Sequence, residues 1–418
     1  TLEDYVFDIG ANSLEIMQFI SKVRKKYLID VPVKIFYEGF KIKDLLKKIE
    51  TLIDKSEKRE IYSVEKVETK ECEASRAQNR MYVMNKMFKD SITYNAPIIV
   101  RIFTALNKKK IRSIFKELLN RHEVLRTIYE LKDGILYQRV KDDAVLNITF
   151  TDMSNYKSTE EFAKTFIRPF DLLKAPMMRI VIGEEKDSYV LMVDAHHICT
   201  DGFSSSILVE EFLTLYNGGK LEPVKYQYRD FSEWQNKFFE SELFKEQEKY
   251  WLKKFENLGE PLDMPVDFER SDLVQVEGAV ERFEIKGDLF NKVNKAIKKL
   301  DVSEYMFYLS ALSILLSKYT NQSENVIGTP ISGRKYEDFK NTLGLFVNTL
   351  ALRNFPEGEK SYKEFLEEVK TTVLESYENQ DYPFEMLVEN VVKDRSVKRN
   401  PIFDVLFAMQ NISNNEGA

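Results

Sequence analysis

The sequence predicts a small all-α unit followed by a larger α/β region. Three observations support this arrangement. Apolar residues recur at helical spacing within residues 1–53, and a charged stretch nearly free of aromatic residues occupies residues 54–70. Beyond residue 70, amphipathic helix patterns alternate with short apolar segments typical of strands. A chain of 418 residues is long enough for two or three domains.

Two helices are predicted within residues 1–53. The first begins near Ser13 and is ended by Asp30 and Pro32, because proline interrupts the backbone hydrogen bonding of a helix. Its apolar positions are Leu14, Met17, Phe19, Ile20, Val23 and Tyr27, and those of the second helix are Ile42, Leu45, Leu46, Ile49 and Leu52. A unit this short exposes much of its surface, which favours a role in contacts with partners.

The charged residues 54–70 are interpreted as a linker. The first element predicted after it is a helix whose apolar stripe runs from Ile111 to Leu119. Two strand pairs follow, 127–131 with 135–140 and 179–183 with 189–193. Asp133-Gly134 predicts a tight hairpin turn in the first pair. A second α/β block is expected from about residue 275.

Composition argues against several classes of protein. Lys and Arg total 62 and Asp and Glu total 68, and the net charge of −6 argues against a dedicated nucleic-acid binder. The two cysteines form no disulfide framework, which favours a reducing, cytoplasmic location. The apolar stretch from Tyr305 to Leu316 is too short for a membrane span and predicts a buried core helix.

Two of the three histidines are adjacent, at the end of a predicted strand and before Asp201-Gly202. Neighbours on a strand point to opposite faces, so one of His196 and His197 can face a cavity while the other is buried. A histidine there suits acid–base chemistry. Two structural histidines remain an equal alternative on local pattern, and a metal site is less favoured because no third ligand is nearby. Cys199 is more simply a buried filler than a nucleophile.

A second local signal is Asp8-Ile-Gly10-Ala-Asn-Ser13 before the first helix. A serine at this position caps a helix in most proteins. The free N–H groups of a helix N-terminus also favour a phosphate. Because the sequence holds no glycine-rich phosphate loop, it shows no means of binding ATP or a dinucleotide.

These residues resemble those of a nonribosomal peptide synthetase. The segment from Asp8 to Ser13 is similar to the serine motif of peptidyl carrier proteins, although Ala11 stands where the family usually has glycine. Seven further motifs resemble those of condensation domains, in order: Ser75–Tyr82, Arg121–Thr127, His196–Gly202, Tyr228–Trp234, Leu343–Arg353, Gln380–Glu385 and Arg399–Phe407. One match would be weak, but seven in the family's order are specific.

The resemblance implies an all-α carrier bundle followed by an α/β, two-lobed fold like that of chloramphenicol acetyltransferase. The carrier would span residues 1–53 and be truncated at its N-terminus. The linker would span 54–70, and the lobes 71–240 and 241–418, the second truncated at its C-terminus. The active site would lie in a tunnel between the lobes, with one carrier at each mouth.

The resemblance also implies the cofactor and the partners. Ser13 would carry 4′-phosphopantetheine, attached by a phosphopantetheinyl transferase. Upstream and downstream carrier and adenylation domains of the same assembly line would supply the substrates. The reaction would form an amide from an upstream thioester and a downstream amine, without nucleic acid and without a membrane span.

Roles follow for the residues of the third motif. His197 would lie in the tunnel and act as general base or as a positioning group for the amine. His196 and Asp201 would be structural, with Asp201 paired to Arg334 of the second lobe. Gly202 would let the backbone approach the substrate.

Two other functions share parts of this pattern. Epimerisation domains carry the same histidine motif, and a non-catalytic module could dock carriers. The segments Leu343–Arg353 and Gln380–Phe384 look like those of condensation domains, which argues against epimerisation. Tyr94-Asn95, Tyr382 and Phe403-Asp404 resemble the subtype that joins an L-configured donor to an L-configured acceptor, and Asn12 points weakly the same way.

Overall fold

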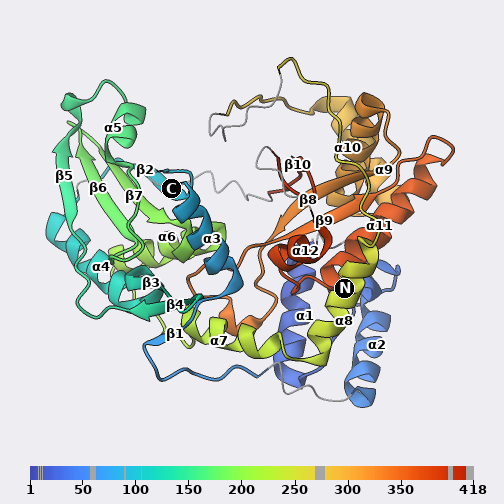
Figure 1. The fold of residues 1–418 in the computed structure, drawn as a ribbon, viewed down its shortest axis with the longest axis horizontal. Helices are drawn as coiled ribbons and strands as arrows, with labels where there is room; N and C mark the ends of the chain where they lie inside the picture. The colour runs from blue at the N-terminus through green and yellow to red at the C-terminus, as the bar shows by residue number, and fades with distance from the viewer. Residues whose placement is uncertain are drawn as a thin grey trace. The chain divides into compact units, whose positions relative to one another are not determined.

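The computed structural model describes residues 1–7, 9, 11, 13–56, 63–88, 91–104, 106–268, 278–393 and 399–410, with Ser13 and Leu14 described by their backbone alone. The chain forms two compact units (Figure 1). Unit 1 comprises Thr1–Tyr62, Glu242–Lys335 and Asn348–Ala418, and unit 2 comprises Ser63–Ser241 and Tyr336–Val347.

A four-stranded sheet forms the centre of unit 2. Its order is β2 (Asn95–Ile102), β7 (Tyr189–His196), β6 (Met178–Glu184) and β5 (Ile148–Asp152). β7 pairs antiparallel with both neighbours, whereas β5 runs parallel to β6. Six of the eight β7 residues are buried, so this central strand gives a fixed starting point for the residues that follow it, which begin with His197. The strand prediction for 189–193 is confirmed.

A smaller sheet of unit 2 contains the predicted hairpin. Its order is β1 (Glu71–Glu73), β4 (Ile135–Val140) and β3 (Thr127–Lys132). Asp133 and Gly134 join β3 to β4 with φ angles of 50° and 83°. Two positive φ values are what a two-residue hairpin turn requires, so the Asp-Gly prediction is confirmed. The helices of unit 2 are α3 (Arg76–Met87), α4 (Lys108–Arg121), α5 (Thr159–Phe166), α6 (Gly202–Tyr216) and α7 (Tyr228–Phe238).

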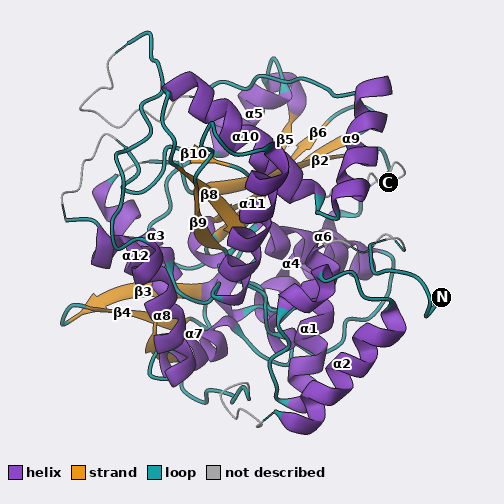
Figure 2. Cartoon of the chain, turned by 90° about the vertical axis from the view of Figure 1, so that its right-hand side faces the viewer, coloured by secondary structure: helices purple, strands orange, loops and turns teal. Residues whose placement is uncertain are grey.

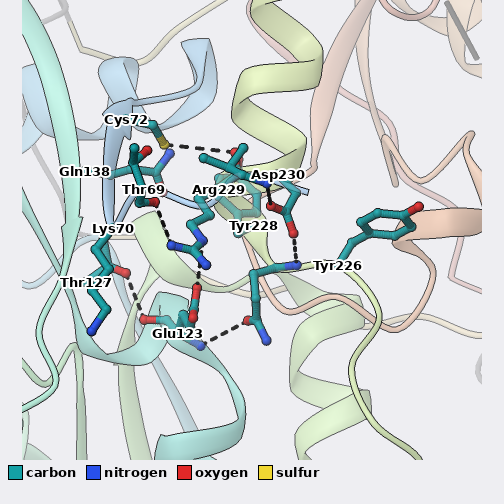
Figure 3. Close-up of polar contacts among 12 residues, drawn as sticks. Thr69, Lys70, Cys72, Glu123, Thr127, Gln138, Tyr226, Tyr228, Arg229 and Asp230 are labelled. Atoms are coloured by element: carbon teal, nitrogen blue, oxygen red, sulfur yellow. Dashed lines mark hydrogen bonds and ion pairs between the residues drawn. The ribbon is translucent and has the colours of Figure 1, made fainter. Parts of the chain in front are cut away.

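The last part of the predicted linker is bound to unit 2. The carbonyl of Val64 accepts a hydrogen bond from Tyr226 (3.0 Å), and the N–H of Val67 donates to Asp230 (2.8 Å). Figure 3 shows Arg229 between Glu123, which it pairs with at 3.0 Å, and the carbonyl of Thr69 at 2.6 Å. Tyr226 and the first turn of α7 therefore hold this part of the segment that was interpreted as a linker.

Unit 1 is built around a three-stranded sheet of order β10 (Val405–Leu406), β8 (Asn325–Ile331) and β9 (Asn348–Asn354). Its helices after the first segment are α8 (Glu242–Lys254), α9 (Gly287–Leu300), α10 (Glu304–Thr320), α11 (Tyr362–Glu378) and α12 (Phe384–Val391). α10 confirms the helix predicted at Tyr305–Leu316 and packs on α11. In the described part of the chain, no helix is long and apolar enough to span a membrane.

The first segment of unit 1 is helical, as predicted. α1 (Ser13–Tyr27) and α2 (Ile42–Lys55) lie side by side, and η1 (Val33–Tyr37) connects them (Figure 2). Ile16, Ile20, Phe36, Leu45 and Ile49 are buried. η1 also contacts α11, and the buried Arg24 side chain donates to the carbonyl of Lys335 (3.1 Å). Side chains of this segment therefore pack against later parts of unit 1 as well as against each other.

Residues 336–347 belong to unit 2, whereas the expected lobe boundary at 240/241 placed them in the second lobe. Side chains of unit 2 bind their backbone. Ser204 Oγ donates to the carbonyl of Gly344 (2.9 Å), and Tyr228 Oη donates to that of Leu345 (2.5 Å). Gly344 is required here, because a Cβ would lie 1.8 Å from the Tyr228 ring. We call residues 342–346 the return segment.

Candidate active site

The histidine pair lies where β7 ends. His196 is the last residue of the strand, and His197 is the first of the short helix η5 (His197–Cys199). The neighbouring strand β2 places Asn95 opposite His196, and the carbonyl of Tyr94 accepts the backbone N–H of His197 at 2.8 Å. The carbonyls of Met177 and Tyr94 thus hold the backbone N–H groups of His196 and His197.

The hydrogen bonding of the His197 ring defines its tautomer. Its Nδ1 lies 2.7 Å from the carbonyl oxygen of Thr200. A carbonyl only accepts, so a neutral ring carries its proton on Nδ1 and leaves the Nε2 lone pair available. The side chain is half-buried rather than sealed. This geometry gives Nε2 the capacity to accept a proton from a substrate.

His196 has a different environment, because it is the last residue of β7 whereas His197 has already left the strand. It is 2% exposed, and its Nδ1 accepts the backbone N–H of Ile198 at 3.0 Å. Burial, followed by the effects of His197 and Arg179, lowers its pKa to about 4. A neutral ring in this position supports the turn, which agrees with a structural role.

Cys199 is fully buried, as expected of a filler. Its Sγ donates to the carbonyl of His196 at 3.1 Å. Burial raises the pKa of the thiol far above its usual range, so it stays protonated near neutral pH. A protonated, buried thiol is not a nucleophile, so Cys199 fits the role of a buried filler.

Asp201 links the histidine turn to the return segment. Its Oδ1 caps α6 by accepting the N–H of Ser204 at 2.7 Å, and its Oδ2 accepts the N–H of Phe346 at 3.0 Å. The carboxylate is 3% exposed. Gly202 is exposed, and a Cβ there would meet no atom within 4 Å. Gly202 thus lies at the surface, at the start of α6.

The two remaining predicted site residues, Ser13 and Arg334, belong to unit 1, whereas the histidine pair belongs to unit 2. Arg334 follows β8, and its backbone N–H donates to Ser332 Oγ at 3.4 Å. The backbone of Ser13 begins α1, while its side chain lies outside the described part of the chain, as do Asp8, Gly10 and Asn12.

Sequence reasoning missed one buried network on α6, the helix that follows the histidine turn. His122 is 1% exposed, and its Nε2 lies 2.6 Å from Glu211 of α6. Arg121 Nε donates to the other oxygen of the same carboxylate at 2.9 Å. Although burial disfavours the charged form, hydrogen bonds from His122 and Arg121 prevail and lower the pKa of Glu211. The network anchors α6, whose first residue is Gly202.

Glu211→Ala should therefore destabilise the fold by about 3–5 kcal/mol, because Arg121 and His122 would lose their shared carboxylate. Chemical denaturation measures the loss. Since the pKa of Glu211 is lowered by folding, its contribution is present above the usual carboxyl pKa and disappears as pH falls through the lowered value.

Glu210→Ala provides the matched control, because Glu210 is the exposed neighbour on the same helix. We expect it to change stability by less than about 0.5 kcal/mol. Equal stabilities of the two variants would contradict an anchoring role for Glu211.

Known proteins resemble this chain along nearly its whole length. The condensation-domain family model matches residues 68–417. Gramicidin S synthase 2 of Brevibacillus brevis is 40% identical over 413 residues, which cover 98% of this chain and 9% of that protein. Bacitracin synthase 3 of Bacillus licheniformis is 36% identical over 414 residues, which cover 98% of this chain and 6% of that protein. The chain thus spans less than a tenth of these relatives.

Solved structures share the fold at lower identity. A four-domain nonribosomal peptide synthetase, holo-AB3403, superposes with a TM-score of 0.75 at 21% identity, covering 82% of this chain and 27% of that one. The X-domain from teicoplanin biosynthesis superposes with a TM-score of 0.74 at 18% identity, covering 83% and 78%. With the family match over most of the sequence, these findings show that the chain belongs to the condensation-domain family of nonribosomal peptide synthetases.

Proposed function

We propose that this chain catalyses peptide-bond formation between two carrier-bound substrates. The observation that carries the proposal is the ring of His197, which is hydrogen-bonded through Nδ1 to the carbonyl of Thr200 and therefore has its Nε2 lone pair available. Membership in the condensation-domain family supports it. The donor is an acyl or peptidyl thioester, and the acceptor is an aminoacyl group on a downstream carrier.

The proposed reaction needs no covalent acyl-enzyme. The acceptor nitrogen attacks the thioester carbonyl, a C–N bond forms and the C–S bond breaks. The proton lost by the nitrogen passes to His197 Nε2 and from there to the departing thiolate. General-base help of this kind contributes roughly 10²–10⁴ in rate. If His197 instead orients the amine, the same Nδ1 hydrogen bond to the Thr200 carbonyl fixes the direction of its ring.

The helical segment 1–53 is proposed to be the upstream peptidyl carrier, with 4′-phosphopantetheine on Ser13. The residues present fit a phosphodiester there, because Ser13 is the first residue of a 15-residue helix whose N-terminal N–H groups favour an anion. When attached, the arm supplies the thiol that carries the donor as a thioester. A phosphopantetheinyl transferase and neighbouring adenylation domains are the implied partners, in the cytoplasm.

Asp201 and Arg334 are proposed to form a structural ion pair. The buried Asp201 carboxylate accepts hydrogen bonds from two backbone N–H groups, and a guanidinium would further stabilise its negative charge. Arg334→Ala should then lower stability by about 3–5 kcal/mol. A double-mutant cycle with Asp201→Asn measures the coupling. Additive effects of the two substitutions would contradict the pair.

The experiment that tests the function loads the chain and a downstream carrier with defined aminoacyl groups. Mass spectrometry of the downstream carrier should detect a dipeptidyl product, faster with an L-configured than with a D-configured donor. The L preference rests on Tyr94-Asn95 and on Tyr382 and Phe403-Asp404. Faster use of the D-donor would contradict the subtype. Racemisation of the donor without dipeptide would indicate epimerisation, and no chemistry at all would indicate a docking module.

A further inference from the structure

A buried carboxylate lies two residues before the histidine pair. Asp194 of β7 is completely buried. Its Oδ2 accepts a hydrogen bond from Asn95 Nδ2 at 2.8 Å and lies 3.5 Å from Arg179 Nη1. Its Oδ1 is buried and has no hydrogen-bond partner among the described residues. One oxygen of a buried acid is thus left unsatisfied.

Such an arrangement costs stability. An unpaired buried acceptor loses its hydration without compensation, and a buried charge needs close pairing to offset desolvation. Burial raises the pKa of Asp194 to about 6, although Asn95, Arg179 and Arg168 act in the opposite direction. A group held in an unfavourable state by an otherwise well-packed sheet is a candidate for function.

The first connection from Asp194 to His197 runs through β2. Asn95 donates to Asp194 and also to the carbonyl of Arg168 at 3.0 Å. The preceding residue, Tyr94, supplies the carbonyl that holds the backbone N–H of His197. Displacement of the Asn95 side chain would move the residue that anchors His197.

The second connection runs through β6. Arg179 lies beside Asp194 and donates to the carbonyls of Arg168 (2.5 Å) and Pro169 (2.6 Å). Its guanidinium stacks on the Phe170 ring, 3.6 Å from the centroid. That ring meets His196 edge-on, with the centroids 5.8 Å apart. Contacts through neighbours on two different strands therefore connect Asp194 to both histidines.

We infer that Asp194 is a positioning residue that holds Asn95 and Arg179 in place and thereby orients the His197 imidazole for proton transfer. The inference rests on the proposed function. The groups that face the carboxylate are Asn95 from β2, Arg179 from β6, Arg168 from the preceding loop and the uncharged thiol of Cys199.

The charge of Asp194 should oppose folding while it supports catalysis. Its pKa is higher in the folded than in the unfolded chain, so the folded state binds the proton more tightly. Stability from this group is greatest below the unfolded value and falls as pH rises through the folded value, near 6. A residue with a merely structural role would instead favour folding at the working pH.

Asp194→Asn tests this separation. The amide keeps the size and the acceptor for Asn95 but removes the charge beside Arg179. We expect an unchanged or higher melting temperature at pH 7.5, because the buried charge is removed. We also expect a kcat lower by about 10- to 10²-fold with KM unchanged, because small misplacements of a catalytic group have effects of this size. The pH–kcat profile should lose its dependence on the group near pH 6, since the Asp194 carboxyl no longer titrates. The control variant is Asp187→Asn, at an exposed residue just before β7. It should leave the melting temperature, the kinetic constants and the pH–kcat profile unchanged.

Histidine NMR gives a readout that does not depend on activity. Selective ¹⁵N labelling of the three histidines reports the tautomer of each ring. The wild-type ring of His197 should show a single Nδ1–H tautomer, which Asp194→Asn should convert to a mixture. Wild-type turnover in the variant, an unchanged His197 tautomer, or a parallel loss of stability and activity would each overturn the inference. If the wild-type chain forms no dipeptide, the proposed function fails. The His197 tautomer measured by NMR still shows whether Asp194 orients that ring.

Discussion

His197→Ala is expected to lower the rate of dipeptide formation by roughly 10²–10⁴-fold. The variant removes the Nε2 lone pair while the backbone hydrogen bond to Tyr94 and the buried strand β7 remain. Because the side chain is half-buried and its hydrogen bond goes to a backbone carbonyl, stability should change little. Single-turnover kinetics with both carriers loaded in advance measure the chemical step without carrier loading.

The exposed Glu210→Ala variant serves as the kinetic control and should turn over at the wild-type rate. A His197→Ala variant that condenses at near-normal speed would exclude a role for this ring in catalysis. A loss of less than about tenfold would favour orientation of the amine over proton transfer.

Ser13→Ala is expected to abolish the attachment of phosphopantetheine and with it all transfer from the chain's own carrier. The serine oxygen is the proposed point of attachment, so the loss should be complete rather than partial. Incubation with coenzyme A and a phosphopantetheinyl transferase, followed by intact-mass spectrometry, should show one added group on the wild type and none on the variant.

Thr51→Ala is a matched control, because Thr51 carries an exposed hydroxyl in the same helical segment. It should accept the label as the wild type does. Persistence of the label in Ser13→Ala would show that another hydroxyl is modified. An upstream donor supplied on a small-molecule thioester should still react with Ser13→Ala, which separates the carrier role from the condensation step.

Local patterns in the sequence predicted some of the helices and strands. Apolar spacing located α1, α2, α4 and α10, and Asp133-Gly134 predicted the β3–β4 turn. Strand alternation also predicted that one of the two histidines can be buried while the other is not, since neighbours on a strand point to opposite faces. These features depend on residues a few positions apart, which is why the sequence alone determines them.

Tertiary structure decided the surroundings of the histidines. Glu211 joins His122 across 89 positions of sequence, and Asp201 binds the N–H of Phe346 across 145. Asp194 and Asn95 meet across 99 positions because β2 pairs with β7. No local period relates such residues, since each contact depends on which strand or helix the packed core brings alongside. Local sequence singled out the pair of adjacent histidines, and the long-range pairing of β2, β6 and β7 decided which of the two is buried and what surrounds them.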